Sequence, residues 1–103
     1  MEFTCEVVNQ NVKTKKEKDY KYKVTEVTLE TLRLGSDIVN LVNEEVSVSL
    51  EEVDFVAEVT NVTVSIKKVN KIPLRNYKIK LEFDGTNDDI ARLVNKTVEA
   101  SLS

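Results

Sequence analysis

The sequence predicts a β-rich α+β fold in which two β-β-α-β repeats share one core about a pseudo-twofold axis. Val, Thr, Ile and Tyr are abundant, and these stiff side chains favour strands. Only two Gly and one Pro occur, which indicates long regular elements with few tight turns. Residues 2–51 also align with residues 54–103 without a gap, so one repeated unit should supply all six strands and both short helices.

The chain of 103 residues has room for one hydrophobic core, and we expect a single domain over residues 1–103. Its apolar fraction of 41% and charged fraction of 32% are typical of a soluble globular protein. Neither repeat is large enough to bury its apolar faces alone, so both should contribute to the same core. Two arrangements stay open: a barrel-like one, and an open sheet with both helices on one face.

The internal repeat becomes visible when 52 is added to each residue number of the first half. Seventeen of the fifty pairs are then identical, whereas shared composition alone would give roughly three or four. The identical pairs include Phe3/Phe55, Asn9/Asn61, Leu29/Leu81, Leu41/Leu93 and Asn43/Asn95. The repeats therefore span residues 2–51 and 54–103.

Each repeat begins with a half-buried strand. Phe3, Cys5 and Val7 alternate with polar residues, and the residues 52 positions later follow the same pattern. Past Asn9 and Asn61 the apolar residues change parity, as one additional residue in a strand would cause. We therefore expect a β-bulge or a bend at each Asn.

A lysine-rich turn and a second strand follow, so the first two strands of each repeat should form a hairpin. Farther along, Ile38, Leu41 and Val42 have the i, i+3, i+4 spacing of a short amphipathic helix of two or three turns, and residues 90, 93 and 94 repeat it. Residues 86–89 offer capping oxygens at the start of the second helix. Asn43 and Asn95 tolerate the left-handed conformation that often ends a helix. A last strand, residues 46–50 or 98–102, completes each repeat.

This gap-free pair of β-β-α-β units resembles the double-psi β-barrel, a family of six-stranded barrels with two short helices. The resemblance covers the whole chain in element order. The glycine-marked turns common in that family are mostly replaced, since Gly35 aligns with Asn87 and Gly85 aligns with Arg33. The resemblance implies a barrel but no particular function, because the family hosts enzymes, substrate-recognition modules and nucleic-acid machinery.

The residue types argue against an enzyme. There is no His, which removes His-based nucleophile arrangements, His-ligated zinc and the commonest general base near neutral pH. Cys5 is the only cysteine, and we expect it to be a small buried hydrophobe. Two isolated Gly cannot build a phosphate-binding loop. We therefore expect no catalytic residues and no cofactor.

The densest acidic group is Asp84, Asp88 and Asp89. Its spacing matches no calcium loop, and a hard cation usually needs more oxygen ligands than this loop offers. Capping of the second helix explains these residues with fewer assumptions. We expect no metal site.

Charge is distributed unevenly, which is the one feature that points to a function. Twelve of the fifteen basic residues lie in two segments, residues 13–23 and 67–80, whereas the rest of the chain is acidic. Tyrosines are interleaved with these lysines, and a basic strand with aromatic residues can neutralise phosphates while it stacks on bases. The candidate nucleic-acid-binding residues are Lys13, Lys15, Lys16, Lys18, Tyr20, Lys67, Lys68, Lys71, Arg75 and Tyr77.

Taken together, these features favour a small non-enzymatic binding module, such as an adaptor, inhibitor or assembly accessory, that acts through protein-protein contacts. Nucleic-acid binding by the two lysine-rich hairpins is the alternative, and an open sheet would also leave edges for a homo-oligomer. We expect no membrane partner and a cytoplasmic location, because no signal peptide or bilayer-spanning stretch occurs. Small acidic β proteins without motifs are also frequent among bacteriophage gene products.

Overall fold

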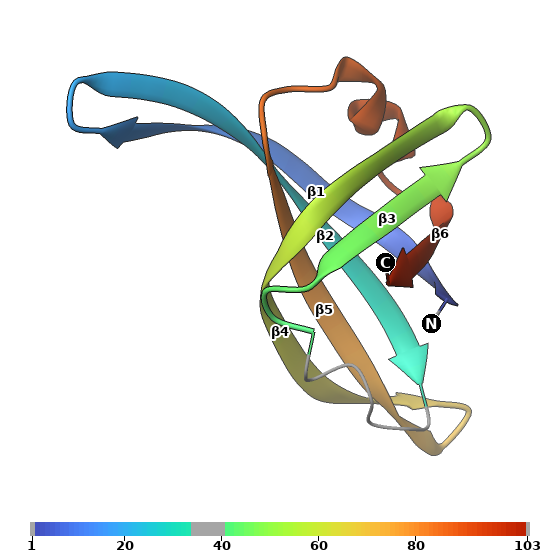
Figure 1. The fold of residues 1–103 in the computed structure, drawn as a ribbon. Helices are drawn as coiled ribbons and strands as arrows, with labels where there is room; N and C mark the ends of the chain where they lie inside the picture. The colour runs from blue at the N-terminus through green and yellow to red at the C-terminus, as the bar shows by residue number, and fades with distance from the viewer. Residues whose placement is uncertain (1, 34–40, 103) are drawn as a thin grey trace.

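The computed structural model describes residues 2–33 and 41–102. Most of these residues belong to six β-strands. Figure 1 shows them in chain order. The strands are β1 (Glu2–Glu17), β2 (Tyr20–Arg33), β3 (Glu45–Leu50), β4 (Val53–Val69), β5 (Ile72–Asp84) and β6 (Thr97–Leu102). Their length agrees with the scarcity of Gly and Pro and with the many β-branched side chains.

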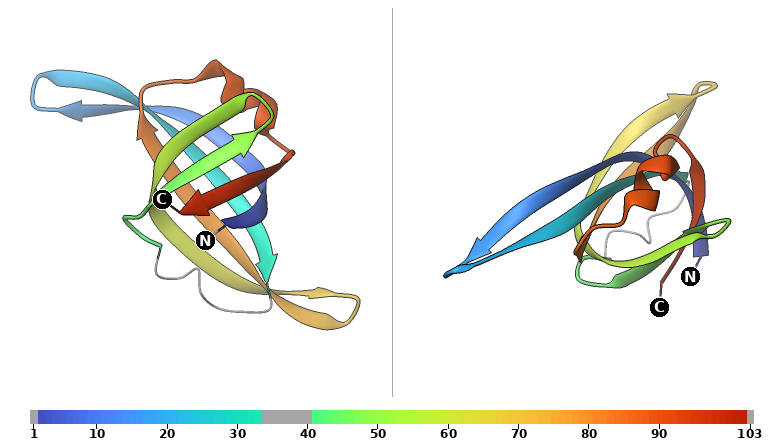
Figure 2. Two further views of the ribbon diagram at one scale, coloured as in Figure 1. Left: turned by 45° about the vertical axis from the view of Figure 1, so that its right-hand side comes forward. Right: turned by 90° about the horizontal axis from the view of Figure 1, so that it is seen from above.

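The six strands close into one barrel in the order β1-β2-β5-β4-β3-β6, and every neighbouring pair is antiparallel. The sheet is therefore not open. The two views in Figure 2 show this barrel with a hairpin extending from it on opposite sides. Closure leaves no unpaired strand within the barrel wall itself.

The strand pairing repeats with the same offset of 52 residues that relates the two halves of the sequence. Glu6 pairs with Glu30 in the β1–β2 ladder, and Glu58 pairs with Glu82 in the β4–β5 ladder. The β2–β5 ladder joins equivalent strands and contains the pair Thr28–Lys80, whose members are themselves 52 residues apart. A pseudo-twofold axis thus passes through this pair and, across the barrel, through the equivalent β3–β6 pairing.

The core fills the inside of the barrel with alternate residues from all six strands. The fully or almost fully buried side chains include Phe3, Cys5, Val7, Val27, Leu29, Val46, Val48, Phe55, Ala57, Val59, Tyr77, Ile79, Leu81, Val98 and Ala100. The alternation predicted for the first strand of each repeat is confirmed, because Glu6 and Glu58 are exposed on the outer face. Both halves contribute to this one core.

The β-bulges predicted at Asn9 and Asn61 are confirmed. The β1–β2 register shifts between Val7 and Asn9, and the β4–β5 register shifts between Val59 and Asn61. Each bulge changes the parity of the strand at the point where it leaves the barrel and increases its twist.

The prediction of an α+β fold with two short α-helices is wrong. The second helix is a six-residue 3-10 helix, η2 (Asp88–Leu93), and the first falls mainly on residues 34–40, which lie outside the described residues. No helix includes Leu41 or Val42. The i, i+3 spacing of Ile90 and Leu93 also fits the three-residue repeat of a 3-10 helix, and so short a connection between strands gives an α-helix too few turns to be stable.

The segment after each expected helix is tied to the bulge of its neighbouring strand. Asn43 and Asn95 have positive φ values of 74° and 69°, so the predicted left-handed conformation is confirmed at both. The Asn95 N–H donates to the Val7 carbonyl at 2.6 Å, and the Asn43 N–H donates to the Val59 carbonyl at 2.8 Å. These bonds end the connection abruptly and direct the chain into β6 or β3.

Equivalent leucines anchor both connections to the core. Leu41 is 4% exposed and Leu93 is 3% exposed. Both are therefore buried, as expected for the apolar face of the predicted amphipathic helices, although neither lies in an α-helix. Asn87 caps η2 as expected, because its side-chain oxygen accepts a hydrogen bond from the Asp89 N–H at 3.0 Å. Burial rather than helix propensity therefore holds these short connections in place.

Candidate binding hairpins

Both hairpins continue beyond the barrel wall as two-stranded ribbons, residues 14–23 in one hairpin and 67–74 in the other, whose strands pair only with each other. The β1–β2 ladder runs to the pair Glu17–Tyr20, and the β4–β5 ladder runs to Val69–Ile72. On the other side of β1 and β4, pairing with β6 and β3 ends at Glu6 and Glu58. The two ribbons leave from opposite ends and give the molecule extents of 52 × 29 × 23 Å (Figure 2).

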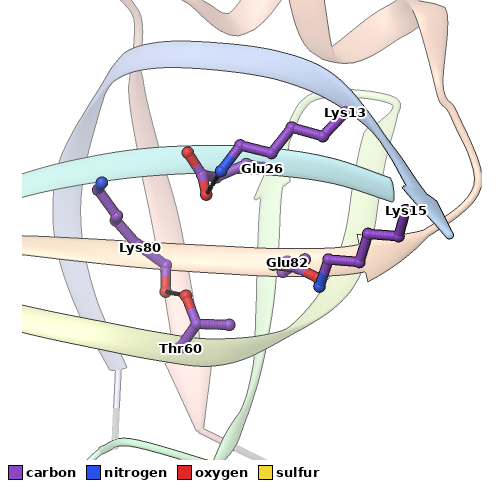
Figure 3. Close-up of polar contacts among 6 residues, drawn as sticks. All are labelled: Lys13, Lys15, Glu26, Thr60, Lys80 and Glu82. Atoms are coloured by element: carbon purple, nitrogen blue, oxygen red, sulfur yellow. Dashed lines mark hydrogen bonds and ion pairs between the residues drawn. The ribbon is translucent and has the colours of Figure 1, made fainter. Parts of the chain in front are cut away.

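Two lysines of the β1–β2 hairpin, Lys13 and Lys15, contact the outer wall of the barrel. Lys13 Nζ lies 2.8 Å from Glu26 Oε2, and Lys15 Nζ forms an ion pair with Glu82 (Figure 3). The two carboxylates are only 14% and 18% exposed, so the barrel wall shields these contacts. The hydrogen bond to Glu82 raises the pKa of Lys15. Carboxylates on the barrel therefore balance part of the positive charge of these two lysines.

Four glutamates that lie side by side on the barrel wall explain the position of Lys13 and Lys15. Strand pairing places Glu26, Glu82, Glu58 and Glu45 next to one another across β2, β5, β4 and β3. Like charges directly opposite each other destabilise a sheet, and Lys13 and Lys15 offset part of that repulsion. A surface concavity of ≈ 460 Å³ lies at this point, lined by Lys15 and by three of the glutamates. Within the described residues, no group of carboxylates or thiols has the geometry to hold a metal ion.

The same place beside the β4–β5 hairpin has a different arrangement. Lys67 is the equivalent of Lys15, and Glu30 is the equivalent of Glu82. Glu30, however, lies 3.7 Å from Lys78 Nζ and accepts a hydrogen bond from Asn76 at 3.3 Å. Lys78 occupies the position equivalent to Glu26. Glu30 thus has cationic and polar neighbours already, and Lys67 forms no ion pair with any residue that the structure describes.

The ten candidate nucleic-acid-binding residues fall into two separate groups. Those on the β1–β2 hairpin are Lys13, Lys15, Lys16, Lys18 and Tyr20, and those on the β4–β5 hairpin are Lys67, Lys68, Lys71, Arg75 and Tyr77. Because the hairpins extend from opposite ends of the barrel, the structure does not bring these groups together (Figure 2). One continuous basic face across both hairpins is therefore absent from the described part of the chain.

Their exposure also differs. Tyr77 is 0% exposed and belongs to the core, so its ring is not available to stack on a base. Tyr20 is 66% exposed, and its ring stacks on Tyr22 with centroids 5.7 Å apart. All of the basic side chains among the ten are exposed, although Lys13 and Lys15 have the carboxylate partners described above.

Exposed apolar side chains on the β4–β5 hairpin were missed by the sequence interpretation. Ile66 is 65% exposed, Ile72 is 55% exposed and Val64 is 42% exposed. Their alternation is the same as that of a core strand, which is why the sequence alone places them on a buried face. The unequal strand lengths are the signal that could have shown this exposure. β4 has 17 residues and the neighbouring β3 has only 6, so much of β4 must extend past β3.

The two other groups considered in the sequence have structural roles. Cys5 is 4% exposed, and burial together with the nearby Glu99 carboxylate raises the pKa of its thiol to about 12. A thiol with this pKa stays protonated and is a poor nucleophile. Among the acidic residues of the β5–β6 connection, Asp89 lies 3.3 Å from Arg92 within η2, next to the Asn87 cap.

No protein-family model, curated protein or solved structure matches the chain. Across residues 2–33 and 41–102, the structure has no helix that is long and apolar enough to cross a membrane.

Proposed function

We propose that this chain is a non-enzymatic binding protein, such as an adaptor, inhibitor or assembly accessory, whose binding element is the β4–β5 hairpin. One observation carries the proposal. On this hairpin, Val64, Ile66 and Ile72 are exposed close to Lys67 and Lys68. Neither lysine forms an ion pair with a described carboxylate. Apolar side chains held in water and bordered by charged groups are typical of protein interaction sites.

A partner that covers this hairpin would gain free energy by burying its exposed apolar side chains. Each exposed branched side chain contributes roughly 1.5–3 kcal/mol when it becomes fully buried. All three apolar side chains are exposed, so a partner can bury them without disturbing the barrel. The barrel then acts as a rigid support that holds the ribbon in an extended shape.

Matched variants test this proposal by quantitative co-purification from cells of the natural source. Ile66→Asp should remove the specifically retained protein, because it places a carboxylate in the apolar contact. Thr14→Asp is the control, since position 14 is the equivalent of position 66 on the β1–β2 hairpin. Equal retention by both variants and the unaltered chain would show that the β4–β5 hairpin is not the binding element.

Nucleic-acid binding is the second candidate function. It is supported by residues 59–81, which include Lys67, Lys68, Lys71 and Arg75 but no acidic residue. A salt titration with single-stranded and duplex DNA separates the two functions, because phosphate contacts make affinity fall steeply with salt. Lys67→Glu or Lys68→Glu should weaken such binding. No binding at low salt would exclude this second function.

We further propose the cytoplasm as the compartment. Cys5 is the only cysteine in the sequence, so no disulfide within the chain is needed for folding.

A further inference from the structure

Among the described residues, no strand pairs with one side of β4 where this strand leaves the barrel. Pairing with β3 ends at Glu58, and the last backbone bonds on that side join Val59 to Asn43 and Glu44. From Asn61 to Val69, no strand of the described chain lies there, whereas β5 pairs with β4 on the opposite side along its whole length (Figure 1). This segment is an edge strand although the barrel itself is closed.

The direction of the free backbone groups follows from the turn. Asn70 and Lys71 have φ values of 51° and 67°. Positive φ values at both central residues are typical of the type I′ turn, a two-residue turn common in β-hairpins. In such hairpins, the pair that flanks the turn, here Val69 and Ile72, exchanges both hydrogen bonds. Alternation from Val69 then directs the N–H and C=O groups of Lys68 away from β5.

Because this direction alternates along the strand, the N–H and C=O groups of Ile66, Val64 and Val62 also point away from β5. Val59 gives an independent check, because its backbone bonds to Asn43 and Glu44 lie on this same side. Val59 and Val62 can share a side only if the strand contains one additional residue between them. The bulge supplies it at Thr60, whose hydroxyl donates to the Lys80 carbonyl at 3.3 Å (Figure 3).

This edge lacks most of the features that usually prevent pairing with another strand. Natural edges are protected by charged side chains, by Pro or by a bulge within the exposed stretch. Residues 62–66 are Val-Thr-Val-Ser-Ile, without charge or Pro, and they follow the bulge. The equivalent residues 10–14 of β1 include Lys13, which forms an ion pair with Glu26 across the hairpin.

We propose that the 62–68 edge of β4 binds an extended segment of an acidic partner protein, which pairs with β4 as an additional strand of the sheet. The proposal rests on the function proposed above and specifies its ligand. Backbone bonds would form at Val62, Val64, Ile66 and Lys68, and side chains of the partner on the same face would cover exposed Val64 and Ile66.

Charge identifies the partner as acidic. The hairpin from residue 59 to residue 81 has six basic residues and no acidic one. In an antiparallel arrangement, residues near the N-terminal end of the added segment would lie opposite Lys67 and Lys68. Acidic residues there, followed by alternating apolar residues, would complement both features of the edge. A second copy of this chain fits less well, because it would bring two such basic hairpins side by side.

The test uses the full chain and two labelled peptides in a fluorescence anisotropy titration. The first peptide has the sequence Glu-Glu-Ile-Thr-Val-Thr-Val. The second is N-methylated at its Ile and first Val, so it keeps the charge and side chains but loses two backbone donors. We expect the first peptide to bind, and N-methylation to weaken binding on the order of tenfold or more, because main-chain bonds would hold it.

Protein variants locate the binding edge. Val64→Pro should abolish binding of the first peptide, because Pro removes an N–H that points to the free edge and leaves the β4–β5 ladder intact. Val12→Pro, at the equivalent position of β1, is the control and should bind normally. Circular dichroism melting of both variants checks that each is folded, and Val64→Thr, which keeps the N–H, should retain binding if Val64→Pro does not fold.

Three results would overturn the inference. They are equal binding of the two peptides, no binding of either, and concentration-dependent dimerisation in sedimentation that Val64→Pro abolishes. None of these results contradicts the proposed function, which fails only if Ile66→Asp and Thr14→Asp retain the same proteins. A partner lost with Ile66→Asp but kept with Val64→Pro would mean that the hairpin binds through its side chains and not by strand addition.

Discussion

The two hairpins share one backbone design but differ in what their side chains contact. Each has a bulge at the same Asn, the same strand register and a two-residue turn. Lys13 and Lys15 of the β1–β2 hairpin have carboxylate partners on the barrel, whereas Lys67 of the β4–β5 hairpin has no ion pair among the described residues. The β4–β5 hairpin also has an exposed isoleucine, Ile66, at the position that Thr14 occupies in the other. Two exchanges contribute to this difference, because Lys13 of one half is Ser65 in the other and Glu26 is Lys78.

This comparison teaches that a duplicated fold can preserve its core while its surfaces acquire different roles. Inside the barrel, equivalent residues are alike, as with Leu29 and Leu81, which are both 0% exposed. Outside it, Thr14 faces water on one hairpin where Ile66 does so on the other. Close packing constrains the positions inside the barrel, whereas the exposed positions on the hairpins can change.

The largest expected effect concerns the core, where the two halves should behave alike. Leu41→Ala and Leu93→Ala should each lower the free energy of unfolding by about 2–5 kcal/mol, because each removes a buried side chain and leaves a cavity. Urea denaturation measures both. A near-neutral result at only one of them would mean that the halves do not contribute equally to one core.

The second largest expected effect concerns the Lys13–Glu26 ion pair. Reproducing it on the β4–β5 hairpin should weaken binding of the acidic peptide. The double variant Ser65→Lys with Lys78→Glu gives the β4–β5 hairpin the charges that positions 13 and 26 have in the β1–β2 hairpin. We expect affinity for the acidic peptide to fall on the order of tenfold, since the added carboxylate also gives Lys67 a neighbour of opposite charge. Anisotropy titration measures the change, and unaltered affinity would mean that the hairpin charges do not select the partner.

A pH-dependent effect should distinguish Cys5 from its equivalent, Ala57. Because burial raises the thiol pKa from 9.0 to about 12, the unfolded chain ionises first as pH rises. The stability contributed by the neutral thiol is therefore complete below pH 9 and is lost between pH 9 and pH 12. The loss should reach about 1 kcal/mol at pH 10.

Cys5→Ala supplies the control for this effect, because it gives the first strand the residue of the second. Urea midpoints at pH 8 and pH 10 should differ less for Cys5→Ala than for the unaltered chain. An identical pH dependence in both proteins would show that another group causes the loss.

The smallest expected effect concerns the ion pair at the base of the β1–β2 hairpin. Lys13→Ala should cost ~0.2–1 kcal/mol of stability, a difference that high salt reduces. Ser65→Ala at the equivalent position should be close to neutral. If the two substitutions have the same effect in low salt, the Lys13–Glu26 contact does not hold the hairpin against the barrel.

Local patterns in the sequence predicted the parts of the fold that depend on near neighbours. The buried face of Phe3, Cys5 and Val7, the bulges at Asn9 and Asn61 and the burial of the connecting leucines all follow from spacing that the chain itself displays. The α-helices were wrong, because i, i+3 spacing does not distinguish an α-helix from a single short 3-10 segment.

The candidate site was predicted less well, because it depends on contacts between distant parts of the chain. The Lys15–Glu82 pair joins residues 67 positions apart, and only barrel closure brings them together. In the same way, Val64 and Tyr77 pair across β4 and β5, yet Tyr77 is buried and Val64 is 42% exposed. Alternation indicates which face a side chain is on, but not where along the strand the core ends.

Photo-crosslinking at equivalent positions tests most directly whether the two hairpins differ in function. Benzoylphenylalanine would replace Ile66 in one protein and Thr14 in another, and each would be irradiated in cells of the natural source. We predict a discrete cross-linked protein for position 66 and none for position 14. The same products from both positions, or products from position 14 alone, would contradict the assignment of binding to the β4–β5 hairpin.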